Sequence, residues 1–118
     1  MDISWNDKGP IYRQLHDRLV ELILEGVFSD GDPLPSVRQI AAEQRINPIT
    51  ISKSLQMLVD ESLVEKRRGL GMFVCDGAAK KLVVLERKKF LEEEWPMALA
   101  KIQRLGFQVD DLLKEMPQ

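Results

Sequence analysis

The side chains best suited to binding chemistry lie in the middle of the chain. Residues 33–75 hold six basic and four acidic side chains, whereas residues 1–32 hold three basic and seven acidic ones. The six basic residues are Arg38, Arg45, Lys53, Lys66, Arg67 and Arg68. Lysine and arginine bind phosphate, and arginine can also bind guanine through two hydrogen bonds. Because the net charge of the chain is −2, a site for a polyanion would be local to this stretch.

Two short helices are expected to position several of these residues. Ser36 can cap a helix whose third residue is Gln39, and this helix should run to about Gln44. Asn47 and Pro48 are typical of a second helix start, with a side-chain cap followed by proline at the first helical position. Two helices joined by about three residues predict a helix-turn-helix.

The second of these helices has one apolar face and one polar face. Its inward residues are predicted to be Ile51, Leu55, Leu58, Val59 and Ser62. Lys53 then points outward between Ile49 and Gln56, with Thr50 and Ser52 on the two shoulders. Ile49 is unusual on such a face. It is expected either to pack against a thymine methyl group in a major groove or to pack against the turn beside Ile46.

A basic hairpin follows directly. Residues 63–67 and 72–74 predict two short strands, and the glycines within residues 68–71 let the backbone reverse between them. Lys66, Arg67 and Arg68 lie at the tip, where they could enter a narrow minor groove or form a solvated edge. A helix-turn-helix followed by such a hairpin predicts a winged helix.

Helices are expected on both sides of this region. Before it, a helix beginning at Gly9-Pro10 and ending at Gly26 carries one apolar stripe. After it, residues 79–95 form a charged helical segment, and Trp95-Pro96 marks a kink or a restart. Gly106 ends the next helix, and a last short helix from Asp110 stops at Pro117.

The tail has more apolar side chains than so short a helical piece can bury. They are Leu82, Phe90, Leu91, Trp95, Ala98, Ile102, Leu105, Phe107, Val109, Leu112 and Leu113. A second copy of the chain is the simplest cover. The expected architecture is therefore mainly α with a small β-hairpin. Residues 1–75 would form a winged helix-turn-helix domain and residues 76–118 a helical dimerisation tail.

Three segments carry a family resemblance. Residues 10–15 read PIYRQL, residues 34–41 read LPSVRQIA and residues 63–74 read LVEKRRGLGMFV. Together they resemble the winged-helix DNA-binding domain of GntR-family transcription regulators. The short tail resembles that of the YtrA subfamily, whose tails mainly dimerise. The resemblance implies a bacterial, repressor-like regulator that binds a palindromic DNA operator as a homodimer.

The resemblance and the helical wheel together give the expected contact residues. Those expected to bind DNA are Ser36, Arg38, Asn47, Ile49, Thr50, Ser52, Lys53, Arg67, Arg68 and Gly69. The family places a DNA-contacting arginine at Arg38, and at Ile49 it often has a polar residue, commonly Asn. The expected dimerisation residues are Leu82, Phe90, Leu91, Trp95, Ile102, Leu105, Leu112 and Leu113.

Other classes of protein fit the sequence less well. No apolar run exceeds four residues and the start lacks an export leader, so a cytoplasmic protein without a membrane span is expected. With a single cysteine, Cys75, and a single histidine, His16, neither a metal site nor a cofactor is expected. No nucleophile, base and orienting group form a recognisable motif, so catalysis is not expected.

Two alternative functions remain open at this stage. The winged helix could be a protein-interaction adaptor, in which the acidic first helix and the apolar tail matter and the basic residues do not. It could instead bind RNA, although Tyr12, the only tyrosine, lies in the first helix and offers little base stacking. A small-molecule effector is left unassigned, because a ligand pocket is hard to enclose in the tail.

Overall fold

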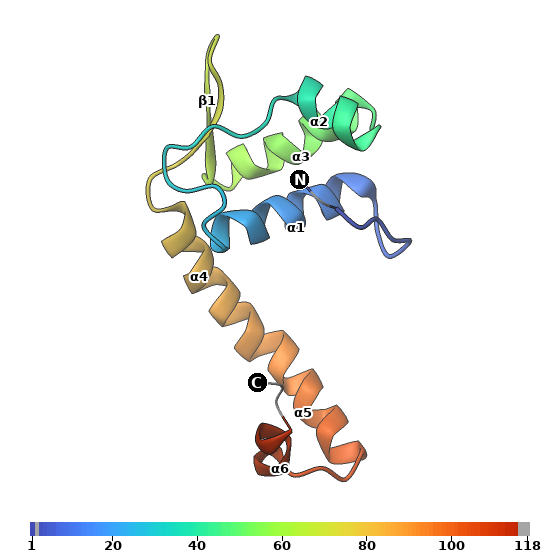
Figure 1. Cartoon of the computed structure of the whole chain (residues 1–118). Coiled ribbons are helices and arrows are strands. Elements are labelled where there is room, and N and C mark those ends of the chain that lie inside the picture. Colours follow the sequence, from blue (N-terminus) through green and yellow to red (C-terminus); the bar gives the residue numbers. More distant parts are fainter. Residues whose placement is uncertain (2, 116–118) are drawn as a thin grey trace. The chain divides into compact units, whose positions relative to one another are not determined.

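The computed structural model describes Met1 and residues 3–115. In chain order the elements are α1 (Ile11–Leu24), α2 (Val37–Gln44), α3 (Pro48–Asp60), β1 (Val64–Arg67), β2 (Gly71–Val74), α4 (Ala78–Lys89), the π-helical turn η1 (Phe90–Glu94), α5 (Trp95–Arg104) and α6 (Val109–Lys114) (Figure 1). This order confirms the predicted winged helix followed by a helical segment. None of the helices in the described ranges combines the length and apolar character needed to cross a bilayer.

The chain forms two compact units, Met1–Leu82 and Val83–Gln118. The division lies later than the expected boundary after residue 75, because the start of α4 packs with the first unit. Ala78 and Leu82 are buried in the same apolar core as α1 and α3. Leu82 is only 4% exposed, so the prediction that it contributes to a dimer surface is wrong.

The core of the first unit is built around α3. Ile51, Leu55 and Leu58 are fully buried and, as predicted, form its inward face. They pack with Leu15, Leu19 and Ile23 of α1, Ile40 of α2, and the buried valines of the hairpin, Val64 and Val74. Because these apolar residues of α3 are covered by α1, α2 and the hairpin, the helix has one orientation in the unit.

Two serines of this region differ from the expectation. Ser62, predicted inward, lies beyond the end of α3 with φ 60° and is exposed. The helix has already ended there, since the Ser62 and Leu63 N–H groups bond back to the Val59 and Leu58 carbonyls. Ser54 is fully buried instead, and its hydroxyl donates to the Tyr12 carbonyl at 2.6 Å, which satisfies a polar group inside the core.

The starts of α2 and α3 follow the predicted capping chemistry. The Gln39 N–H donates to Ser36 Oγ at 3.0 Å, and the Ser36 N–H donates to Gln39 Oε1 at 2.8 Å. The Ile49 N–H donates to Asn47 Oδ1 at 2.9 Å, and Pro48 is the first residue of α3. At α1, Pro10 precedes the helix instead of lying in its first turn.

The hairpin is held to the body by a short preceding segment. β1 and β2 pair antiparallel, with Lys66 opposite Met72 and Arg67 opposite Gly71. The Leu34 N–H donates to the Met72 carbonyl, and the Val74 N–H donates to the Asp32 carbonyl, both at 2.9 Å. This third line of backbone bonds makes the hairpin a fixed wing, since a two-stranded hairpin alone is only marginally stable.

The second unit runs from the last part of α4 through η1 into α5. The sequence predicts a kink or a restart at Trp95-Pro96, whereas the helix continues through a π-helical turn that ends directly before Trp95. Proline lacks an N–H and its ring would clash with the carbonyl four residues earlier, and a π turn relieves both problems. Gly106, at φ 76°, ends α5 as predicted. The predicted stop at Pro117 lies outside the described residues.

Two isoleucines of α3 provide a matched test of this packing. Ile51→Ala should lower the free energy of unfolding by about 2–5 kcal/mol, because it empties a fully buried site. Ile49→Ala, on the exposed face of the same helix, should change it by no more than about 0.5 kcal/mol. Chemical denaturation followed by circular dichroism measures both values. Equal effects at the two positions would show that the inward face is misassigned.

Candidate nucleic-acid interface

The outward face of α3 carries the residues predicted for it. Ile49 is 78% exposed, Ser52 and Lys53 are exposed, and Thr50 is half-buried on the shoulder. Asn47 is exposed at the start of the helix, where its side chain already caps the Ile49 N–H. The high exposure of Ile49 does not fit the expectation that it packs against the turn beside Ile46. A large apolar side chain is therefore presented at the start of a polar surface.

Lys53 is held by a contact that sequence reasoning missed. Its Nζ lies 3.9 Å from the centroid of the Tyr12 ring, which belongs to the first turns of α1. Attraction between an ammonium group and an aromatic face restrains the lysine without removing its charge. The Tyr12 carbonyl also accepts the Ser54 hydroxyl bond, so both ends of this residue are tied to α3. Tyr12 thus positions a cation on the outward face.

The start of α2 presents a second group of donors. Ser36 and Arg38 are both exposed, and Ser36 also caps the helix. The first backbone amides of a helix carry a partial positive charge that favours a phosphate. Arg38 adds a full charge and a planar fork of donors in the first turn of the same helix. The start of α2 therefore offers donors of the kind that bind phosphate.

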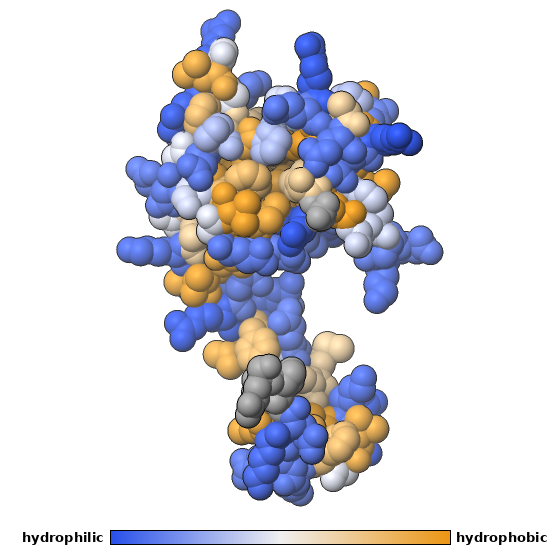
Figure 2. Space-filling view, viewed as in Figure 1, coloured by the Kyte–Doolittle hydropathy of each residue, from blue (hydrophilic) through white to orange (hydrophobic). Residues whose placement is uncertain are grey.

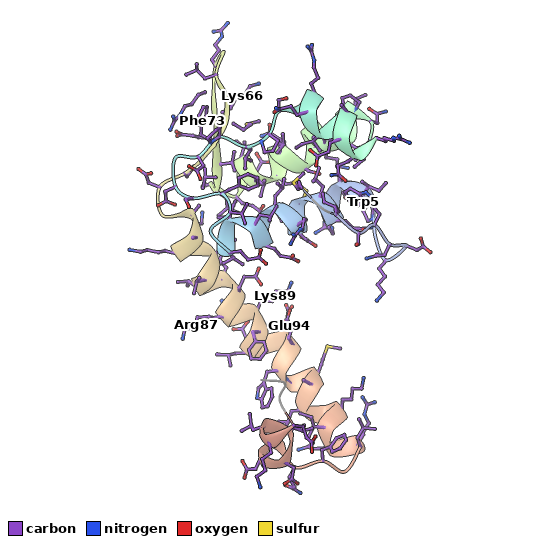
Figure 3. The ribbon with its side chains drawn as sticks, viewed as in Figure 1. Trp5, Lys66, Phe73, Arg87, Lys89 and Glu94 are labelled. Carbon is purple, nitrogen blue, oxygen red and sulfur yellow. The ribbon has the colours of Figure 1, made fainter. Side chains whose placement is uncertain are left out.

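The two faces of the wing carry different side chains. Alternation along β1 puts Glu65 and Arg67 on one face of the hairpin and Lys66 on the other, and Phe73, paired with Glu65, shares the face of Glu65. Phe73 and Lys66 are both labelled on the wing in Figure 3. The Arg67 guanidinium lies 4.2 Å from the Phe73 ring centroid, and its Nη2 is 2.8 Å from Glu65 Oε1. Arg67 is thus partly engaged within the wing. Lys66, absent from the predicted contact residues although noted at the tip, is the basic side chain on the opposite face.

A groove of about 500 Å³ lies between the start of α2, the exposed side of α3 and the wing. Both apolar and polar residues line it, with Ser36, Gln39, Ser52, Gln56 and Lys66 among the polar ones. The structure thus brings Ser36, Ser52, Arg67 and Gly69 of the predicted set around one groove. Arg38, Asn47, Ile49, Thr50, Lys53 and Arg68 are not among the residues that line it.

The remaining titratable candidates are structural. His16 is buried and joins the end of α3 to α1, with Nε2 bonded to Glu61 and Nδ1 bonded to Asp17. Cys75 is half-buried just after β2, where its N–H donates to the Leu63 carbonyl. Burial raises the pKa of the Cys75 thiol, and the Glu65 and Asp76 carboxylates raise it further. The thiol is therefore protonated, and a poor nucleophile, near neutral pH.

The profile of the bacterial regulatory proteins of the gntR family matches residues 11–74. The chain belongs to the GntR family. The match begins at α1 and ends at β2, so it covers the three helices and the wing that surround the groove. The family predicted from the three segments is confirmed, and GntR proteins are DNA-binding transcription regulators and not enzymes.

Individual relatives extend this similarity beyond the winged helix. The transcriptional repressor YtrA of Bacillus subtilis is 37% identical over 83 residues, which cover 70% of this chain and 64% of YtrA. The regulator YhcF of Bacillus subtilis is 32% identical over 97% of this chain and 93% of its own length. A GntR-family regulator from Listeria monocytogenes has the same fold, with a TM-score of 0.79 at 24% identity over 96% of this chain and all of its own. The predicted likeness to YtrA is confirmed.

Proposed function

We propose that this GntR protein represses transcription in the bacterial cytoplasm by binding a palindromic operator as a homodimer. The observation that carries the proposal is the shared groove, because it brings the start of α2, the exposed side of α3 and the wing together. A helix and an adjacent hairpin in this arrangement can enter a major groove and the neighbouring minor groove. Repression is inferred from YtrA, which is itself a repressor.

We assign base reading to α3. Its outward face offers Lys53 and Ser52 as hydrogen-bonding groups, with Thr50 beside them and Ile49 at the helix start. Lysine and hydroxyl side chains bind base edges or phosphates, and an apolar side chain in the major groove fits the thymine methyl group. The Tyr12 ring restrains the Lys53 side chain before DNA binds. Less side-chain entropy is therefore lost when Lys53 contacts DNA.

We assign phosphate binding to the residues beside α3. Ser36, Arg38 and the α2 amides would hold one strand, and Lys66, which lines the same groove as Ser36, would add a further charge. Arg68 and Gly69, at the wing tip, would enter the minor groove. Arg67 donates from Nε and Nη2 to Glu65, so it would contact phosphate through its remaining donors.

We assign dimerisation to the second unit. A stripe with spacings of four and three residues follows η1 and α5: Leu91, Trp95, Ala98, Ile102 and Leu105. Phe90, Leu91, Leu105 and Leu113 are exposed, whereas Trp95, Ile102 and Leu112 are half-buried. The Phe90 and Trp95 rings stack at 6.4 Å within this surface. A twofold dimer would present two copies of α3, and hence favours a palindromic site.

The function is tested by selecting bound fragments of genomic DNA with the purified full chain. We expect a small set of promoter sites with two inverted half-sites about one helical turn apart. Lys53→Glu and Arg68→Glu should abolish their recovery, and Lys80→Glu, an exposed charge in α4, should not. Binding to a recovered site should weaken about 10³- to 10⁵-fold between 50 and 200 mM salt if the dimer contacts ~6–10 phosphates. Recovery of scrambled competitor as efficiently as promoter DNA would refute the proposal.

Ile49 gives a test of base reading. In a library of operator variants, the wild type should prefer T·A at one position of each half-site, because burial of the thymine methyl against Ile49 is favourable. Ile49→Asn should lose that preference by about five- to tenfold and keep the preferences at other positions. An unchanged preference for T·A in Ile49→Asn would show that Ile49 does not contact the base.

The molecular mass in solution tests the proposed dimer surface. Light scattering should give the wild type about twice its chain mass of 13.5 kDa. Leu105→Glu, at a site 59% exposed on the stripe, should give a monomer that binds a full operator no better than a half-site. Met97→Glu, at a site 74% exposed on another face of α5, is the matched control and should stay dimeric. A monomeric wild type, or a dimeric Leu105→Glu, would contradict the assigned surface.

A further inference from the structure

The tip of the wing carries a large apolar side chain that the fold does not bury. Leu70 is 73% exposed, a value exceeded among the exposed apolar residues of the first unit only by Ile49. In Figure 2 a small apolar area lies near the end of the wing, among hydrophilic residues. Unlike Ile49, Leu70 lies outside α3, in the turn between β1 and β2. At this exposure the side chain is available for contact with another molecule.

Leu70 is presented on a rigid and slender support. Its N–H donates to the Arg67 carbonyl at 2.9 Å, which closes a tight turn. Gly69 at φ 78° and Gly71 at φ 114° flank it, both in conformations that favour glycine. Because neither neighbour has a side chain, Leu70 projects from a narrow tip. The backbone bonds between β2 and residues 31–34 fix the strand that follows the tip.

The surroundings of Leu70 identify the kind of surface that it meets. Lys66, Arg67 and Arg68 precede it within four positions, and Leu70 itself lines the groove shared with α2 and α3. A cluster of cations around an apolar tip favours a polyanion with an apolar or recessed interior. The minor groove of DNA is such a surface, with phosphates on both edges and base edges on its floor.

We propose that Leu70 makes the wing select A·T base pairs by excluding the 2-amino group of guanine. All four base pairs present acceptors on the minor-groove floor, and only pairs with guanine add a donor, the N2 amino group. A leucine has no acceptor, so it would cover that amino group, displace its water and leave a donor unpaired. The inference rests on the proposed operator binding, and it adds a specificity-determining residue outside α3.

Exclusion of the amino group by Leu70 differs from two other ways in which the wing could contact the minor groove. A leucine that packed only on the sugars would leave A·T and G·C equivalent. Reading through the stiffness of the flanking DNA would favour A·T without any role for the leucine. The distinguishing feature is the amino group itself. Inosine tests whether the amino group matters, because an I·C pair presents the major-groove edge of G·C but lacks the minor-groove amino group, and replacement of Leu70 separates a direct contact from DNA stiffness.

The experiment uses the full chain and an operator recovered from genomic DNA. Each A·T pair outside the α3 contacts is replaced in turn by G·C and by I·C, and dissociation constants are measured by fluorescence anisotropy. For the wild type we expect one or two adjacent positions in each half-site where G·C weakens binding about tenfold and I·C restores it to within about twofold. At other positions the three pairs should bind alike.

Variants identify the residue responsible. Leu70→Ser supplies an oxygen that can accept from the amino group, so it should bind the G·C and I·C operators equally. Val27→Ser, at another exposed apolar site of the first unit, is the control and should keep the wild-type discrimination. Circular dichroism should show both variants folded, since neither side chain is in the core.

Four results would contradict the proposed role of Leu70 or the function on which it rests. I·C operators that bind as weakly as G·C operators, or discrimination that persists in Leu70→Ser, would overturn the inference and leave operator binding intact. Equal binding of A·T and G·C at every flanking position would overturn it as well. A wild type with no preference for any operator would instead show that the proposed function fails, and the inference would fall with it.

Discussion

The structure depends on the burial of one face of α3. Ile51, Leu55 and Leu58 are removed from water by α1, α2, the hairpin and the start of α4, and this burial sets which face of the helix remains outside. A helix has a period of 3.6 residues, so turning it by about half a turn would expose this apolar row and bury Lys53. Neither is tolerated. The direction of every outward side chain of α3 therefore follows from a packing constraint on the opposite side of that helix.

Polar interactions refine the placement that packing establishes. The buried Ser54 hydroxyl bonds the Tyr12 carbonyl, and the Tyr12 ring attracts Lys53, so one residue of α1 supports both the buried and the exposed side of α3. On the wing, Glu65 and Phe73 hold Arg67 on one face, which leaves Lys66 on the other. These contacts hold positively charged side chains at defined positions on α3 and the wing. The net charge of −2 does not indicate such a local concentration.

Much of the first unit could be predicted, because its signals are local. The caps at Ser36 and Asn47 act over two or three residues, and the structure contains both. The apolar spacing of α3 correctly gave its inward residues up to Leu58, and failed at Ser62 because a left-handed residue ends the helix there. The tail was harder. Apolar spacing does not indicate the π-helical turn before Pro96. Nor does it distinguish a partner surface from the winged-helix core, in which Leu82 is buried.

The sequence by itself determined the order and type of the elements apart from the π-helical turn, the family, and the outward residues of α3, since capping, turn chemistry and helical periodicity are properties of neighbouring residues. Only the tertiary structure decided which distant residues meet: Tyr12 with Lys53, Arg67 with Glu65 and Phe73, and the start of α2 with the wing across one groove. It also decided that Leu82 is core and that Leu70 is not. The physical reason is that burial and long-range contact depend on how whole elements pack together, and no local pattern of residues carries that information.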